Sequence, residues 1–559
     1  MLPAYALALS LLVTGPLLGP GYLLLRDAVS TPRSYLTDAA LGLTEAAPRA
    51  LPQDFLVAVV STGLDGGVVV KILVVAGLWL AGWGAARLAS TVLEVGSAGQ
   101  FIAATMAIWN PYVAERLLQG HWSLLVGYGA LPWVAVSMVK LRAGAGWGSA
   151  WGLMFWIALA GLTPTGLMLA ATVALVCVAA PGAGWSRPRA AGLTRPRAAG
   201  WTRLRAAGLG LGAAILAATP WLVAAMVGGS VSSPDSAAGV QAFAARAEPG
   251  LATLGSLAGL GGIWNGDAVP ESRTTAFAFV ATVVLLGVVA LGLPVVVRNR
   301  AAVPLLVLAA AALLIPAAMA TGVGLAFVEA VVRAVPGLGV VRDGQKWVAL
   351  AMPGYALAAA AAPATLSRLR VPAAAAAAVC CAALIAVLPD LAWGVGNQMR
   401  AVQYPASWAA AAAQINADPL PVVALPPDSM REFPWAPGAP VLDPLPRWVR
   451  AEVYQTGDLS IGGQTVPGEG ARARAVQDLV LSGASDRKLA EAGVGWVVRE
   501  SGGDVAVHRV GGSSAVSPHR GLMIGAHLVW LSALVVGAAG MVVSGWRVRR
   551  TGTRPSFAP

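Results

Sequence analysis

Long apolar stretches restrict the fold of this chain more than any other feature. About twelve segments run for roughly 17 to 25 residues with few charges, the length that crosses about 30 Å of hydrocarbon as a helix. With 57% hydrophobic and only 11% charged residues, the 559-residue chain lies outside the range of soluble domains. We therefore predict an all-α polytopic membrane protein. The predicted spans are 3–25, 67–86, 97–112, 122–139, 148–163, 165–181, 206–227, 274–297, 302–322, 346–364, 372–391 and 521–545.

The basic residues behind the net charge of +12 are concentrated in alternate loops between these spans. This distribution indicates membrane topology and not a nucleic-acid partner. If the N-terminus is cytoplasmic, the predicted inner loops and tail are almost purely basic, and Glu94 is their acidic exception. We therefore expect a plasma-membrane protein with both termini cytoplasmic. The outer loops would be 26–66, 110–121, 228–273 and 323–345. The inner basic residues are Arg87, Lys140, Arg142, Arg187, Arg189, Arg195, Arg197, Arg203, Arg205, Arg298, Arg300, Arg368, Arg370, Arg547, Arg549, Arg550 and Arg554.

The stretch 392–520 differs in character, because charge, proline and glycine all rise there. Helical patterns at 404–417 and 471–492 and strand patterns at 421–425, 494–499 and 505–510 predict a small extracytoplasmic α/β module. The expected organisation is a membrane core at 1–391, this module, and a last span with a basic cytoplasmic tail at 521–559.

An inner loop at 186–208 repeats a basic pattern about every eight residues. It is typical of an anchor on anionic lipid, and a specific partner site is the alternative. The cysteines, Cys177, Cys380 and Cys381, all lie in predicted spans, so neither a disulfide framework nor a metal site is expected.

The first outer loop carries acids close to the membrane surface, chiefly Asp27 and Asp54, with Asp38 a weaker candidate. Asp27 is expected at the C-terminal end of the first helix, where the helix dipole opposes a carboxylate. A carboxyl group with a raised pKa would suit a general base that takes a proton from a sugar hydroxyl. The alternative is that each acid is an ordinary interfacial charge.

The second outer loop crowds polar groups between two apolar runs, which is costly near hydrocarbon unless they are paired or hydrated. Asn110 and the following proline stop a helix, and a short turn then places Tyr112, Glu115 and Gln119 on one face with Arg116 beside them. Trp122 and His121 are interpreted as interfacial residues, with sugar binding the alternative for Trp122. The residues proposed for substrate binding in this loop are Asn110, Tyr112, Glu115, Arg116, Gln119 and Trp122.

The fourth outer loop ends with Arg342 and Lys346 on either side of a predicted helix start. Two cations at a helix N-terminus would make a cradle for a lipid-linked phosphate. The alternative is that Asp343 caps the helix and the cations extend toward the interface. In the third outer loop, Trp264 is a candidate for stacking on a sugar.

At these residues the chain resembles the GT-C superfamily of integral membrane glycosyltransferases, and more narrowly actinobacterial proteins related to arabinofuranosyltransferases. The resemblance implies a polyprenyl-phosphate sugar donor, an outward-facing site and an inverting transfer assisted by a first-loop acid, Asp27 or else Asp54. Adjacent paired acids and long carbohydrate-binding modules of many relatives are not visible, which leaves metal dependence and acceptor class open. The similar runs are 47–54, 110–117, 127–133, Arg342-Asp343 and Lys346.

The sequence therefore predicts a transferase that moves a sugar from this donor to an envelope glycan or glycolipid. Its expected partners are membrane lipid, donor and acceptor, without nucleic acid, and no cofactor beyond the donor is predicted. A flippase for lipid-linked saccharides is one alternative, although the expected internal repeat is not visible. A non-catalytic assembly factor is another.

Overall fold

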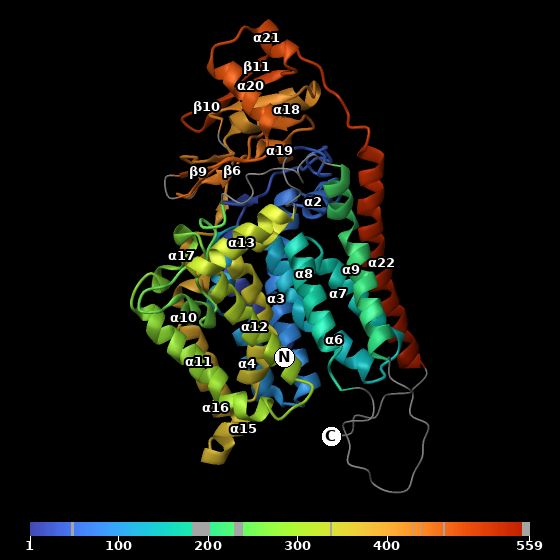
Figure 1. Ribbon diagram of the computed structural model, residues 1–559, viewed down its shortest axis with the longest axis vertical. Coiled ribbons are helices and arrows are strands. Elements are labelled where there is room, and N and C mark those ends of the chain that lie inside the picture. Colours follow the sequence, from blue (N-terminus) through green and yellow to red (C-terminus); the bar gives the residue numbers. More distant parts are fainter. Residues whose placement is uncertain are drawn as a thin grey trace.

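The protein consists of a helical bundle with a smaller α/β module stacked on one end (Figure 1). The start of α1 and the end of α22 both lie toward the opposite end of the bundle (Figure 1). The computed structural model describes residues 1–45, 50–181, 202–227, 239–335, 338–427, 429–436, 438–461 and 464–550. Most of the basic repeat 186–208 and part of the run 47–54 lie outside the described residues.

Each predicted span contains a helix of the bundle, although many of these helices are shorter than predicted. The twelve helices are α1 (Leu2–Thr14), α3 (Gly66–Val92), α4 (Ser97–Ile108), α6 (Trp122–Arg142), α7 (Trp147–Ala160), α8 (Pro164–Cys177), α9 (Arg203–Val227), α11 (Phe277–Val296), α12 (Val303–Met319), α14 (Met352–Ala360), α16 (Ala373–Ala386) and α22 (Arg520–Arg550). Shorter helices connect them: α2 (Gln53–Val60), α5 (Pro111–Leu118), α10 (Thr253–Ala258), α13 (Gly322–Ala334), α15 (Ala362–Leu366) and α17 (Ala392–Asn397).

Fewer of these helices than predicted are long enough to cross a membrane. Among the described residues, six helices pass on length and apolar composition, or eight if two bent pairs each count as one span. The number of about twelve spans is therefore not confirmed. The 14-residue helices α7 and α8 reach only about 21 Å at 1.5 Å per residue, short of the roughly 30 Å of hydrocarbon.

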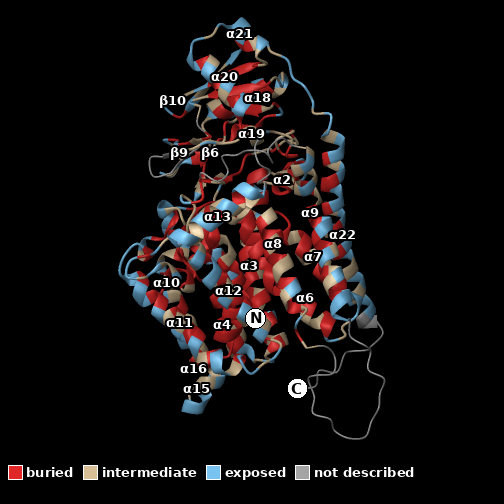
Figure 2. Ribbon diagram, viewed as in Figure 1, coloured by how far each residue is buried: buried red, intermediate tan, exposed pale blue. Residues whose placement is uncertain are grey.

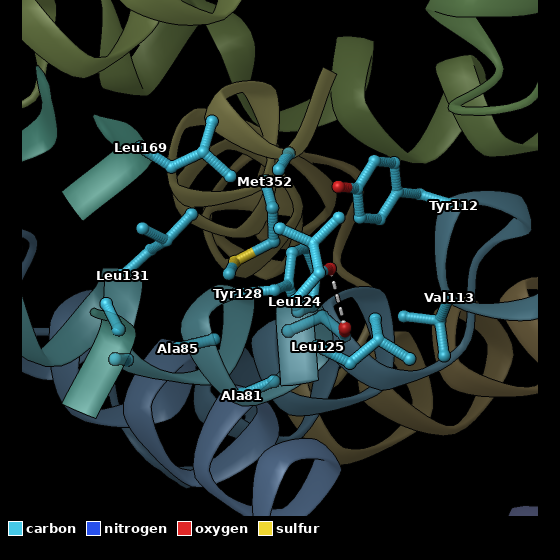
Figure 3. Packing of buried hydrophobic residues seen from close by; sticks show 14 of the residues in the cluster. Ala81, Ala85, Tyr112, Val113, Leu124, Leu125, Tyr128, Leu131, Leu169 and Met352 are labelled. Carbon is cyan, nitrogen blue, oxygen red and sulfur yellow. Dashed lines mark hydrogen bonds between the residues drawn. The ribbon is translucent and has the colours of Figure 1, made fainter. Parts of the chain in front are cut away.

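Small residues allow the central helices of the bundle to approach closely. A Cβ atom built on Gly77 of α3 would lie 3.1 Å from Val126 of α6, and one on Gly129 of α6 would collide with the carbonyl oxygen of Gly77. Close backbone approach through small residues is typical of helix packing in membranes. Figure 3 shows Ala81 and Ala85 in the same packed cluster as leucines of α6.

Outward faces of the bundle are apolar, as expected for contact with lipid. Phe279 and Val283 of α11 and Leu528 and Val535 of α22 are large hydrophobic side chains with high exposure. Figure 2 shows exposed residues along both helices, whereas buried residues concentrate inside the bundle. Exposed apolar surface on this scale marks a membrane or partner contact.

The module contains the strands and helices expected from the sequence. Its sheet has the order β11-β10-β4-β7, in which β10, β4 and β7 are parallel and β11 pairs antiparallel with β10. The expected helix at 471–492 is two helices separated by a glycine-containing turn. These elements are α18 (Ala406–Ala417), β4 (Val422–Leu425), β7 (Val453–Tyr454), α20 (Ala471–Leu481), α21 (Asp486–Glu491), β10 (Trp496–Ser501) and β11 (Asp504–Arg509). Small pieces surround them: β5 (Met430–Arg431), β6 (Val441–Leu442), α19 (Leu445–Trp448), β8 (Leu459–Ile461) and β9 (Gln464–Val466).

A β-hairpin after the first helix joins the bundle to the module. The first span was expected to continue to residue 25, but α1 ends at Thr14 and β1 (Tyr22–Leu25) turns into β2 (Ala28–Val29). β1 also pairs with β3 (Ala401–Val402), and the amide of Leu442 donates to the Arg26 carbonyl at 2.9 Å. The turn of this hairpin carries Asp27, so the module holds the hairpin in place.

Candidate functional site

The second outer loop forms the buried helix α5, and Asn110 builds its start. The Asn110 side chain accepts a hydrogen bond from the Val113 amide at 3.1 Å and donates to the Tyr128 hydroxyl at 3.1 Å. Such a cap satisfies backbone groups that a helix start leaves unpaired. Tyr112 stacks on Tyr128, and both rings are labelled in Figure 3. Asn110 and Tyr112, two of the residues predicted to bind substrate, are therefore buried and stabilise the start of α5.

A buried ion pair joins the second and fourth outer loops. The guanidinium of Arg116 donates to both carboxylate oxygens of Asp343, at 2.9 and 3.1 Å, and to the side-chain oxygen of Gln345. Asp343 also caps the helical turn at 344–351 through the Lys346 amide, as the alternative reading expected. A bidentate pair of this kind is strong and geometrically specific. It fixes the position of Arg116 relative to the loop.

Glu115 ties the third outer loop to the same cluster. Its carboxylate accepts from the backbone amides of Gly262 and Ile263, both at 3.1 Å, and from the Gln345 side chain at 2.9 Å. All three partners are protein groups, and Glu115 is fully buried. Glu115 therefore joins three loops, and its predicted role in substrate binding stays a prediction.

His121 connects this buried cluster to the partly exposed carboxylate of Asp27. Arg116 has donors only, so the His121 Nδ1 atom, 3.0 Å from Arg116, must be the acceptor. The proton then resides on Nε2, which donates to Asp27 at 2.9 Å. Burial lowers the pKa of His121, in accord with this neutral tautomer. His121 was interpreted as an ordinary interfacial residue, and the structure places it instead between two charged groups.

Asp27 is the partly open end of this chain of contacts. Its side chain is 37% exposed and also accepts from the Gln119 amide at 3.2 Å. Burial raises the pKa of Asp27, but the hydrogen bond and electrostatic interaction with His121, the hydrogen bond from Gln119 and the charge of Lys346 outweigh it, so the pKa lies below its ordinary value. The expectation of a raised pKa at a helix end is wrong, because Asp27 occupies a hairpin turn that receives donors.

Gln119 and Gly120 hold the Asp27 turn against α5. The Asp27 amide donates to the Gln119 carbonyl at 3.2 Å, and the Gln119 side-chain oxygen accepts from Asn265 at 2.8 Å. Gly120 has φ of +83°, and a Cβ atom there would lie 2.9 Å from the Asp27 amide nitrogen. Only glycine fits this contact without strain.

The two predicted phosphate ligands lie in different surroundings. The Lys346 ammonium is 3.7 Å from Asp343 and close enough to Asp27 to lower its pKa. Arg342 instead covers the ring of Phe243 at 4.7 Å, and Trp264 packs edge-on against the same ring at 4.6 Å. Lys346 therefore belongs to the Asp27 cluster, whereas Arg342 and Trp264 form a neighbouring aromatic cluster.

The other first-loop acids are engaged elsewhere. Asp54 pairs with Arg447 of the module, with 3.1 Å between the charged atoms, and Asp38 pairs with Arg520 at the start of α22. Trp122 is buried, at 4% exposure. Among the described residues, Asp54 forms no hydrogen bond or ion pair with Asp27. Within the described ranges, no three His, Cys, Asp or Glu side chains are grouped as a metal site would require.

The fold resembles that of a solved arabinofuranosyltransferase structure, in line with the family that the sequence resembles. The particular structure that shows this is arabinofuranosyltransferase AftD from mycobacteria, which superposes with a TM-score of 0.54 at 18% identity. The match covers 89% of this chain but 35% of AftD, so the chain spans about a third of that enzyme's length. Two structures of an AftD variant give TM-scores of 0.48 and 0.47, each at 17% identity over 89% of this chain and 36% of theirs. No family model and no curated protein matches the chain.

Proposed function

We propose that this protein is a membrane glycosyltransferase that moves a sugar from a polyprenyl-phosphate donor to an envelope glycan or glycolipid on the outer face. The observation that carries the proposal is the ionised, partly exposed carboxylate of Asp27, oriented by His121 and Gln119. The fold shared with AftD supports the same class of chemistry. Fold alone does not define an activity, so the site carries the argument.

In the proposed reaction, the oxygen of an acceptor hydroxyl attacks the anomeric carbon of the donor. The bond from that carbon to the phosphate oxygen breaks, and the polyprenyl phosphate leaves with the electron pair. Asp27 accepts the hydroxyl proton as the new glycosidic bond forms, which makes it the general base. Direct displacement of this kind inverts the anomeric configuration.

Cations near Asp27 would stabilise the departing phosphate. Lys346 lies in the Asp27 cluster, and Arg342 lies against Phe243 beside the same loops. Fixed positive charge at the point where negative charge develops is an effective form of catalysis. We assign the phosphate to Lys346 and Arg342, with Trp264 beside the donor sugar.

The outward orientation rests on charge. The loop after α15 and the C-terminal end of α22, both rich in arginine, lie at the end of the bundle away from the module (Figure 1). From the positive-inside rule we infer that this end is cytoplasmic and that Asp27 and the module face outward.

The test is a transfer assay with purified protein in nanodiscs and a panel of polyprenyl-phosphate sugars, including an arabinofuranosyl donor. We expect one donor to give a glycosylated acceptor of inverted configuration, detected by mass spectrometry and NMR. Movement of the lipid-linked sugar from one leaflet of a liposome membrane to the other, without any sugar transfer to an acceptor, would instead support a flippase and overturn the proposal.

A further inference from the structure

We propose that a cavity between the first outer loop and the module binds one neutral sugar unit of the acceptor glycan. The cavity has a volume of about 160 Å³. Its wall comes from four separate parts of the chain: the first loop, the start of α3, the start of α6 and the module. Residues that carry the argument are Val29, Tyr35, Asp54, Trp122, Arg447 and Gln455. The inference rests on the proposed function and specifies where the acceptor would bind.

The size of the cavity fits a single ring. A cavity of about 150 Å³ in another protein holds a benzene molecule, so this one is large enough for a compact ring. Its wall is mixed, with the aromatic side chains of Tyr35 and Trp122 beside hydroxyl, amide and charged groups. A dry apolar ligand would leave those polar groups unpaired, whereas a sugar offers both hydroxyls and an apolar face.

The charged groups of the wall favour a neutral ligand. Arg447 binds Asp54 through two nitrogens, at 3.3 and 3.1 Å, and Asp443 pairs with Arg431 at 3.4 Å. The lining itself carries two carboxylates, Asp54 and Asp443, and one guanidinium, Arg447, so it has no excess positive charge to attract a phosphate. A carboxylate beside a guanidinium presents acceptors next to donors, which matches adjacent hydroxyls on a sugar.

The polar partners and the aromatic wall are held rigidly. Tyr35 lies between the guanidinium groups of Arg33 and Arg450, each 5.1 Å from its ring centre. Side chains fixed before binding lose less conformational freedom when the ligand arrives. The cavity is thus preorganised for a ligand.

The cavity shares its wall with the Asp27 site. Trp122 directly follows His121, which donates to Asp27, and Val29 is two residues beyond Asp27 on β2, so two wall residues adjoin the Asp27 site. Successive Cα atoms are about 3.8 Å apart, so the Cα atoms of Val29 and Asp27 lie at most about 7.6 Å apart. The acceptor would extend from the cavity toward Asp27. The donor phosphate would approach from Lys346, and the neutral acceptor from the cavity.

The test measures binding of two probes to the full chain in nanodiscs, independently of transfer. The neutral probe is a linear arabinofuranosyl hexasaccharide, and the anionic probe is decaprenyl phosphate. Ala39 lines the cavity and is only partly buried, so the larger side chain of Ala39→Phe can extend into the cavity. The substitution removes no polar group. Asp54→Asn removes one charge from the polar pair, and Asp38→Asn is the matched control, since Asp38 forms a similar pair with Arg520 outside the cavity.

We expect Ala39→Phe and Asp54→Asn each to weaken hexasaccharide binding by about tenfold or more, with decaprenyl phosphate binding and the Asp38→Asn variant unchanged. If both variants unfold at the wild-type temperature and bind the hexasaccharide as wild type does, the proposal is wrong even if transfer is observed. Loss of decaprenyl phosphate binding instead would make the cavity a donor site and also overturn it. Hexasaccharide binding lost in both variants without any transfer would support the cavity and contradict the proposed transferase function.

Discussion

The imidazole of His121 donates to Asp27 at 2.9 Å, and its other nitrogen accepts from Arg116 at 3.0 Å. This arrangement requires the neutral imidazole with its proton on Nε2. A single tautomer thus links the partly exposed carboxylate to the buried pair of Arg116 and Asp343. The link explains how a turn on a short hairpin holds a carboxylate in one orientation.

Replacing His121 by leucine should move the acid limb of the kcat/KM profile to higher pH. Activity requires the Asp27 anion, so it is lost as pH falls through the pKa of Asp27. Removing His121 takes away one of the groups that lower the pKa of Asp27, so this pKa should rise by about one to two units, as expected for the loss of a hydrogen bond to a charged group. The control is His508→Leu, because His508 forms a similar but exposed pair with Asp486 in the module. An unchanged acid limb in His121→Leu would contradict the link.

Substitution of Gly120 by alanine should lower activity without altering any polar side chain. The added methyl group would meet the backbone of Ala28 and Asp27, so the hairpin turn must shift. A misplacement of about 1 Å can cost about 100-fold in rate. Gly483→Ala is the control, because Gly483 has φ of +73° but no atom within 4 Å of its Cβ position. Equal activity of the two variants in the transfer assay would show that the contact is unimportant.

Arg116→Met should destabilise the protein strongly. Removing one partner of a buried ion pair leaves Asp343 uncompensated, which costs about 3 to 5 kcal/mol of the free energy of unfolding. The exposed pair of Arg487 and Glu491 on α21 provides the comparison, and Arg487→Met should change stability by less than about 1 kcal/mol. Unfolding in mixed micelles, followed by circular dichroism, measures both. Similar losses in the two variants would show that burial of the pair does not matter.

Arg342→Ala should weaken donor binding. If Arg342 contacts the donor phosphate, its loss raises the KM for the donor by about tenfold or more, with a smaller effect on kcat. Arg333→Ala is the control, since Arg333 pairs with Glu329 on α13 and is largely exposed. A donor KM equal to that of wild type would remove Arg342 from the phosphate site and leave Lys346 as the remaining candidate.

The sequence predicted the helices of the bundle because apolar runs have a clear length and composition, as at Phe277–Val296. The predicted number of spans is not confirmed, since composition alone does not distinguish a short apolar helix such as α7 from one that crosses the membrane. The hairpin at residues 22–29 was missed because its apolar β1 strand continues the apolar run of α1. A partner strand 380 residues away is invisible to local patterns.

The candidate site was predicted only in part, because local patterns do not show contacts between distant segments. Crowded polar residues at 110–121 predicted that these groups have partners, because polar groups near hydrocarbon require them. In the structure, Glu115, Arg116 and Gln119 each form hydrogen bonds to other segments. The role of His121 and the pairing of Asp54 with Arg447 depend on contacts between distant segments. Residue type and spacing alone could not reveal them.

The most direct test of the account is the transfer rate of Asp27→Asn, which is nearly isosteric and retains a group that can hydrogen-bond to His121. With the donor identified in the panel, we predict a loss of about 10² to 10⁴ in kcat with donor binding preserved, as expected for removal of a general base. Asp38→Asn should retain the wild-type rate. If Asp27→Asn transferred sugar as fast as wild type, Asp27 would not be the base and the central claim would be wrong.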